Sequence, residues 1–169
     1  MSIYVNLPRL NNYSGINAAN YAIKYALSPN PSYKYFSIYG NIGGDCTNFI
    51  SQCLIAGGAT MVYKSKPWWY NSRKWSLSWS VANSLYLCIT QRAKLNLPGL
   101  KGVEVTDFRR LELGDLIMYE DSNGSIYHSA IITSFTNDFP LVSQHSYNAL
   151  NISPIKPKAK KMHFIKIVV

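Results

Sequence analysis

The cysteine that follows Gly-Gly-Asp in the segment GGDCTNFISQC has the sequence context of a nucleophile. Asp45 is a good N-cap residue, so Cys46 would lie in the first turn of a helix. Unpaired backbone N–H groups and the positive end of the helix dipole stabilise a thiolate there, and the same N–H groups can hold an oxyanion. Gly43 and Gly44 carry no side chain, so a substrate backbone could approach them closely. We therefore predict Cys46 as nucleophile and oxyanion donor, and the two glycines as substrate-binding residues.

A thiolate nucleophile also needs a base, and the chain has three histidines. His128 opens the apolar run YHSAIIT, and His145 ends the run LVSQHS, 17 positions later. If both runs are antiparallel strands joined by the SFTNDFP turn, the two histidines become neighbours. Such a neighbouring pair suits a base and the group that orients it. His163 lies among lysines, and the sequence shows no obvious partner for it.

Each of these residues also has a structural interpretation. A cysteine at a helix start or a histidine at a strand end is more often structural than catalytic, and only the combination favours chemistry. Cys53 lies two helical turns after Cys46 and is expected in the core. The two Cα atoms would be about 10.5 Å apart, which is too far for a disulfide. We therefore expect reduced thiols.

The elements that must position these residues follow one another as helices first and strands afterwards. Apolar spacing predicts a helix in SGINAANYAIKYAL, one from Asp45 or Cys46 to Gly57-Gly58, and one over about 78–93. Apolar runs on both sides of Asn123-Gly124 predict a hairpin, and LVSQHS and MHFIKIVV are predicted as further strands. The order predicts an α+β fold, with the N-terminal helices packed on a C-terminal antiparallel β-sheet. No repeat or linker divides residues 1–169, so one domain is expected.

Charge and composition limit the class of partner. The net charge is +9, and residues 1–103 hold ten Lys or Arg against one acid, Asp45. A broad positive surface would attract an acidic partner, such as an acidic carrier protein, an anionic polymer or nucleic acid, or would only solubilise the protein. No apolar run is long enough to span a membrane, and no nucleic-acid-binding signature accompanies the charge. The histidines lack further ligands at metal-binding spacing, so we expect no metal and no cofactor.

The N-terminal residues MSIYVNLPRLNNYSG lack the charged start, apolar core and cleavage site of a secretory signal. Read from Met1, the chain is therefore expected in the cytoplasm. A chain trimmed from a secreted protein would begin in the same way.

The segment KSKPWWYNSRKWSLSW places four tryptophans among lysines and an arginine. Trp75 and Trp79 are four residues apart, which favours a helix face packed on the core. Trp68 and Trp69 are predicted as a partly exposed, substrate-binding surface.

Three blocks, GGDCTNFISQCLIAGG, LGDLIMYEDSNGSIYHSAIIT and LVSQHS, resemble in this order the putative amidase domain family of papain-like cysteine enzymes. The resemblance covers most of the chain and implies a papain-like fold similar in layout to bacterial cell-wall cysteine peptidases. It implies Cys46 as nucleophile, His128 as base and acid, and His145 as the third group. Asn148 and Asn151 are rivals for the third position. The glutamine that precedes the cysteine in papain is not evident, so Tyr39 and Asn41 are named only as candidate oxyanion donors.

The expected chemistry is acyl transfer through an S-acyl Cys46. A resemblance to amide-forming, transglutaminase-like enzymes of closthioamide-type thiotemplated biosynthesis implies a carrier-protein thioester or amide as donor and an amine as acceptor. The alternative is an amidase or peptidase that hydrolyses cell-wall peptide amides. A basic nucleic-acid-binding module and a pseudoenzyme scaffold are the non-enzymatic alternatives.

Overall fold

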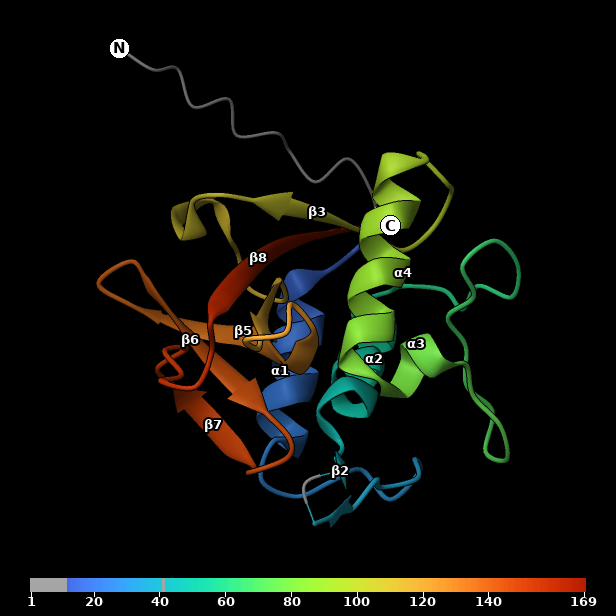
Figure 1. Ribbon diagram of the computed structural model, residues 1–169, viewed down its shortest axis with the longest axis horizontal. Coiled ribbons are helices and arrows are strands. Elements are labelled where there is room, and N and C mark those ends of the chain that lie inside the picture. The colour runs from blue at the N-terminus through green and yellow to red at the C-terminus, as the bar shows by residue number, and fades with distance from the viewer. Residues whose placement is uncertain (1–11, 41) are drawn as a thin grey trace.

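Helices and a large β-sheet form the two main layers of the computed structural model, which describes residues 12–40 and 42–169. Figure 1 shows the helices packed beside the strongly twisted sheet. The helices are α1 (Gly15–Tyr25), α2 (Cys46–Ala56), α3 (Leu77–Ser80) and α4 (Ala82–Lys94), with a 3-10 turn over Phe108–Arg110. The strands are β1 (Ile38–Tyr39), β2 (Ile42–Gly43), β3 (Lys101–Val105), β4 (Leu116–Glu120), β5 (Ile126–Thr136), β6 (Phe139–Gln144), β7 (Ala149–Ile152) and β8 (Lys161–Val168). The predicted α+β class is confirmed.

The large sheet has the order β3-β8-β4-β5-β6-β7, and all neighbouring strands are antiparallel. Its two faces are buried differently, because side chains alternate along each strand. On β4, Leu116 and Met118 join the core beneath the helices, whereas Ile117 and Tyr119 belong to a second apolar cluster. The first core therefore fixes α1, α2 and α4 against the sheet.

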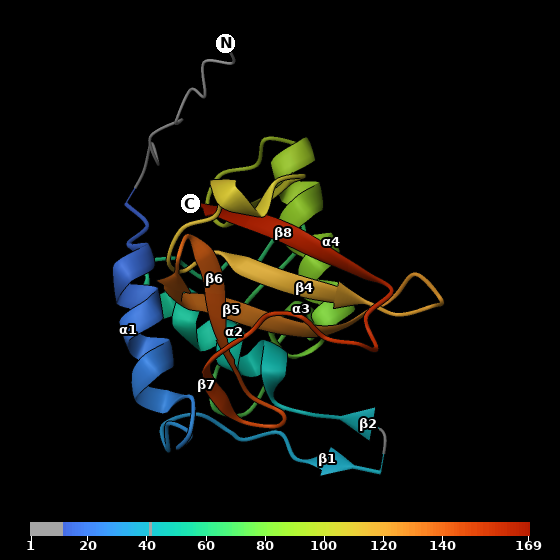
Figure 2. The ribbon, with the colours of Figure 1, turned by 90° about the vertical axis from the view of Figure 1, so that its left-hand side faces the viewer.

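The first two helices pack against each other and agree with the predicted ranges. The Ser14 hydroxyl caps α1 by accepting a hydrogen bond from Asn17 N–H. The backbone N–H of Ser14 donates to Gly57 O, so the start of α1 lies beside the end of α2. Figure 2 shows α1 at one side of the sheet and the start of α2 beside the β1–β2 hairpin. No helix in the described part of the chain combines the length and apolarity needed to cross a membrane.

The single helix predicted over about 78–93 is instead two helices, α3 and α4. Val81 separates them with an extended backbone (φ −117°, ψ 123°) and serves as the C-cap of α3 and the N-cap of α4. Apolar spacing continues across this break, which is why the sequence pattern did not show it. Strands β1, β2, β3 and β7 were also not predicted.

The predicted hairpins are present, with turns that fit their residues. Residues 121–125 connect β4 to β5, and the Asp121 carboxylate accepts hydrogen bonds from Asn123 N–H and Ser125 N–H. Asn137 and Asp138 connect β5 to β6, both with positive φ (46° and 63°), as a type I′ turn requires.

A β-bulge interrupts the pairing of β5 with β6. Ser134 pairs with Leu141, but Ile132 pairs with Val142, so Thr133 is an extra residue on β5. Successive side chains point to opposite faces of the sheet. One extra residue on β5 therefore changes which β6 residues share a face with the β5 residues before the bulge. This change decides which β6 side chain reaches His128.

Two leucines on α4 test the orientation of that helix. Leu85 is fully buried, whereas Leu87 is 43% exposed. Leu85→Ala should lower the free energy of unfolding by about 2–5 kcal/mol, because it leaves a cavity in the core. Leu87→Ala should change it by less than about 1 kcal/mol. Urea unfolding of both variants measures the difference, and equal losses would contradict the described helix face.

Candidate active site

A buried ion pair fixes the start of α2. His145 Nδ1 lies 2.5 Å from Asp45 Oδ2, and each residue is 1% exposed. His145 Nε2 lies 2.8 Å from the carbonyl oxygen of Tyr25 at the end of α1. Both ring nitrogens of His145 are therefore engaged, one by a carboxyl oxygen and the other by a backbone carbonyl oxygen. The other oxygen of Asp45 accepts hydrogen bonds from Phe36 N–H and the Asn48 side-chain amide.

Asp45 occupies the predicted N-cap position, but its side chain makes no capping hydrogen bond. Its carboxylate turns toward His145 instead, and its own N–H donates to Ser146 Oγ at 2.7 Å. The hydrogen bonds of α2 begin with Phe49 N–H to Asp45 O. The N–H of Cys46 therefore precedes the helical ladder, and the Asp45 carboxylate does not compete for it.

Cys46 opens α2 and is partly exposed. Burial alone would raise the pKa of its thiol, but other contacts act more strongly in the opposite direction. The hydrogen bond and charge of His128, the Thr47 hydroxyl and the backbone of Ser129 together lower the pKa of Cys46 from 9.0 to about 7. A substantial fraction of Cys46 is therefore thiolate at neutral pH, as a thiol nucleophile requires.

His128 is held from its other side by Gln144. His128 Nε2 lies 2.9 Å from Gln144 Oε1, and both side chains are buried. The Gln144 amide nitrogen donates to Tyr147 O at 3.1 Å. The amide oxygen therefore faces His128, so Nε2 carries the hydrogen and Nδ1 is the ring nitrogen left for Cys46. This arrangement permits proton transfer between Cys46 and Nδ1.

The residue in contact with His128 Nε2 is therefore Gln144 and not His145. Uninterrupted pairing from the β5–β6 turn would have placed His128 and His145 on the same face, but the bulge at Thr133 reverses this relation. Both ring nitrogens of His145 are engaged by Asp45 and Tyr25 O.

The two asparagine rivals differ in their surroundings. Asn148 is exposed, and Asn151 Oδ1 accepts a hydrogen bond from the Thr133 hydroxyl. Sequence reasoning missed Gln144 although it directly precedes His145. Gln144 is part of the predicted strand LVSQHS, but the bulge at Thr133 that turns it toward His128 leaves no recognisable pattern in the sequence.

The two glycines before Asp45 allow close packing of neighbouring segments of the chain. A Cβ on Gly44 would lie 2.5 Å from Ser146 Oγ, and one on Gly43 would lie 3.1 Å from Ser37 O. Gly44 also has φ of 122°, which side chains disfavour. The two glycines therefore have a packing role, and their substrate-binding role stays a prediction. Of the candidate oxyanion donors, Tyr39 is 80% exposed on β1, and Asn41 lies outside the described residues.

The tryptophans divide differently from the prediction. Trp79 is fully buried, as expected, and Trp75 is partly buried. Trp68 is also fully buried and donates through Nε1 to Ser51 Oγ, so it belongs to the core and cannot line a substrate surface. Trp69 is partly exposed and stacks on Tyr63, and its substrate-binding role stays a prediction.

His163 has partners that the sequence did not reveal. Its two ring nitrogens lie 2.6 Å from Glu104 Oε1 and 2.8 Å from Glu120 Oε2. Glu104 also accepts a hydrogen bond from the Tyr86 hydroxyl. This cluster ties β3, β8 and β4 together. Within residues 12–40 and 42–169, no three His, Cys, Asp or Glu side chains are grouped as metal ligands would be.

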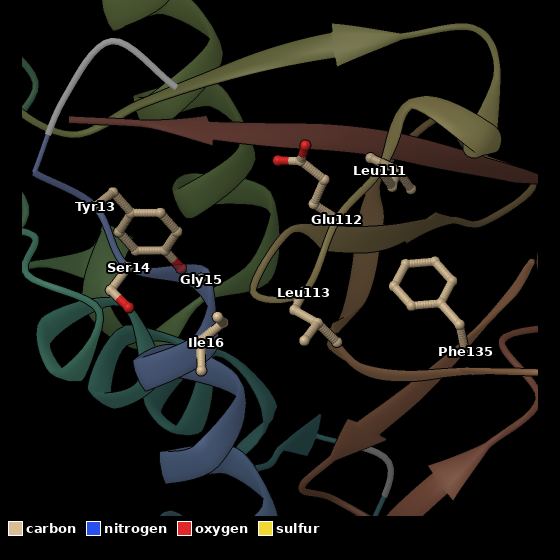
Figure 3. Close-up of a pocket in the computed structure, with 8 residues that line it drawn as sticks. All are labelled: Tyr13, Ser14, Gly15, Ile16, Leu111, Glu112, Leu113 and Phe135. Carbon is tan, nitrogen blue, oxygen red and sulfur yellow. The ribbon is translucent and has the colours of Figure 1, made fainter. Parts of the chain in front are cut away.

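A cavity of about 510 Å³ lies at the start of α1 (Figure 3), lined in part by Tyr13, Leu111 and Phe135. Ser14 beside it bonds to Gly57 at the end of α2, whereas Cys46 begins that helix. An 11-residue helix is about 16 Å long, so this cavity is separate from the Cys46 site.

The pH dependence of alkylation tests the state of Cys46. Because its pKa is about 7, the rate of iodoacetamide modification should rise with pH to a midpoint near 7 rather than 9. His128→Ala removes the contacts that lower this pKa, so the midpoint should move upward. Peptide mapping against Cys46→Ala identifies the modified thiol, since Cys53 and Cys88 are buried. A wild-type midpoint near 9 would contradict the described environment.

Replacing Gly44 tests how the turn before α2 is packed. Gly44→Ala should cost about 1–3 kcal/mol of stability through backbone strain, with a further loss from the contact with Ser146. Gly124→Ala is the matched control, because Gly124 also has positive φ but nothing lies within 4 Å of an added Cβ. Thermal unfolding compares the two. Equal losses would show that the packing against Ser146 carries no weight.

Comparison with known proteins places this site in a family context. Two relatives from Bacillus subtilis (strain 168), the uncharacterized proteins YhbB and YjcM, are 35% identical over 142 residues and 36% identical over 149 residues. The alignments cover 81% and 83% of this chain, but only 42% and 32% of the relatives, so the chain spans less than half the length of either.

No solved structure matches the chain, and the comparisons lend no support to a biosynthetic amide-forming enzyme. The family model described as "Putative amidase domain" matches residues 12–167, which contain every described residue of the site. The chain belongs to this putative amidase domain family.

Proposed function

We propose that the protein is a cysteine-dependent amidase that acts through an S-acyl Cys46 intermediate. The observation that carries the proposal is the hydrogen-bonded series Cys46, His128 and Gln144, together with the pKa of Cys46 of about 7. Such a series supplies a nucleophile, a base that becomes an acid, and a group that orients the base. The family match supports amide bonds as the substrate class.

In the first half-reaction the Cys46 thiolate attacks the carbonyl carbon of the amide. The proton that left the thiol is held on His128 Nδ1 and passes to the amide nitrogen as the C–N bond breaks. The amine leaves, and the acyl group stays on Sγ as a thioester. Gln144 stabilises the imidazolium by accepting its Nε2–H throughout.

In the second half-reaction, water attacks the thioester carbonyl and gives its proton to His128 Nδ1. The C–S bond breaks, the carboxylic acid leaves, and the Cys46–His128 pair is restored. In both steps a negative charge develops on the carbonyl oxygen. The N–H of Cys46 at the positive end of α2 is the proposed donor to that oxygen.

The rim of this site offers apolar surface to a substrate. Ile38 of the β1–β2 hairpin lies close to Gly44, at the turn that leads to Cys46. Exposed aromatic side chains occur on the two flanking segments, Tyr39 at 80% and Tyr147 at 84% exposure. We propose that these side chains contact the acyl part of the substrate.

An amine can replace water as the second nucleophile, which would make the protein a transpeptidase. The net charge of +9 favours an acidic donor, such as a carrier protein that bears a thioester. We therefore propose an amine as acceptor and an acidic carrier protein as donor in this second version of the reaction. The same Cys46 and His128 would perform the transfer.

Ester cleavage tests the covalent step without knowledge of the natural substrate. Wild-type protein mixed with p-nitrophenyl acetate should release a burst of p-nitrophenolate equal to the protein concentration, as Cys46 becomes acetylated. Cys46→Ala should show no burst. His128→Ala should slow it by about 100-fold or more. A folded wild-type protein without a burst would support a scaffold or a nucleic-acid-binding module instead.

Hydroxylamine added to the acetylated protein tests the acceptor. A transferase should convert its acyl group to the hydroxamate with a rate that saturates in the amine. A hydrolase should form acetate. Hydroxylamine should then divert acyl groups only in proportion to its concentration, without saturation. Saturation would favour the amine, and its absence would favour water.

A further inference from the structure

A lysine outside the two strands and the helix of the site reaches its centre. Lys156 lies in the connection between β7 and β8 and is only partly exposed. Its Nζ donates to Gln144 Oε1 at 2.6 Å, the oxygen that also accepts His128 Nε2–H. The ammonium group also lies 5.1 Å from the ring centre of Tyr119. In the sequence, Lys156 belongs to the run KPKAKK, which is typical of a solvent-exposed segment.

The ammonium group restricts the orientation of the Gln144 amide. Lysine has three N–H donors and no acceptor, so only the amide oxygen can face it favourably. The amide NH₂ group then turns toward Tyr147 O. Without Lys156, the amide could rotate and present NH₂ to His128, which would place the hydrogen on Nδ1. His128 could then no longer accept the Cys46 proton through Nδ1.

The rings behind His128 make this orientation part of one packed cluster. Tyr119 pairs with His128 across β4 and β5, and their ring centres are 5.5 Å apart. The Tyr119 hydroxyl is buried and has no hydrogen-bond partner within the described residues, so it makes no hydrogen bond to His128. Lys156 covers the Tyr119 ring. Gln144 is therefore the group through which the lysine acts on His128.

Lys156 also supplies charge beside Cys46. Burial lowers the pKa of Lys156, and the charge of Cys46 acts on it in the opposite direction, so the two groups attract each other. Two charged groups interact with Cys46, His128 from β5 and Lys156 from the β7–β8 connection, and Tyr119 of β4 lies behind His128. Asp45 precedes Cys46, but its carboxylate is paired with His145. Lys156 therefore adds a positive charge, and Asp45 does not neutralise it because the Asp45 carboxyl group is paired with His145.

We propose that Lys156 is a positioning residue of the Cys46 site, which fixes Gln144 with its oxygen toward His128 and favours the thiolate of Cys46. The inference rests on the proposed function, since it concerns the same nucleophile. It also identifies a long-range requirement, because the β7–β8 connection must dock for the site to be reactive.

Alkylation of Cys46 by iodoacetamide across pH tests this role in the intact chain. Lys156→Met should raise the midpoint of the pH profile and slow modification at neutral pH by about threefold or more, through loss of the nearby positive charge. Lys156→Arg keeps the charge and a donor, so it should restore most of the rate. Lys158→Met is the matched control, because Lys158 is exposed on the same connection and should leave the profile unchanged.

A second probe separates charge from folding. The rate ratio of iodoacetate to iodoacetamide falls when a positive charge is lost from a site, so it should fall in Lys156→Met but not in Lys158→Met. If Lys156→Met does not fold, as judged by circular dichroism, Lys156→Gln gives the same comparison with a polar neutral side chain.

An unchanged midpoint and ratio in a folded neutral variant would overturn the role of Lys156, while the proposed function would stand. If wild-type Cys46 itself shows a midpoint near 9, the proposed function fails first.

Discussion

The buried pair of Asp45 and His145 is the contact on which the site depends. One hundred residues separate its members, yet it joins the end of α1, the start of α2 and the turn after β6. His145 also stacks on Phe49, with ring centres 4.0 Å apart. Breaking a buried ion pair by removing one partner leaves an uncompensated charge, at a cost of about 3–5 kcal/mol. The position of Cys46 is therefore set by contacts that do not themselves touch its sulfur.

The same pair controls the electrostatics of the nucleophile. A carboxylate free to turn toward Cys46 would disfavour the thiolate, but the Asp45 carboxyl group is held against His145. The groups that remain around Cys46 are His128, Lys156 and the backbone N–H groups at the start of α2. One histidine thus holds the acid that precedes Cys46, and another contacts Cys46 itself. The sequence interpretation had assigned both to a single catalytic arrangement.

Local patterns predicted the parts of the fold that depend on local physics. The α1 and α2 ranges, the hairpins around Asn123-Gly124 and Asn137-Asp138, and the α+β class follow from spacing and turn residues. The break at Val81 and the bulge at Thr133 could not be predicted, because each is one residue that leaves the apolar pattern intact. That bulge moves the contact with His128 from His145 to Gln144. Long-range contacts likewise decided the burial of Trp68 and the position of Lys156.

The central claim is that Cys46 carries the acyl group during amide cleavage. Peptide mapping of protein quenched during turnover of an amide substrate tests it most directly. The account predicts an acyl group on the peptide that contains Cys46, and its accumulation when the second nucleophile is withheld. Continued amide cleavage with unmodified Cys46, and equal cleavage by Cys46→Ala, would contradict it.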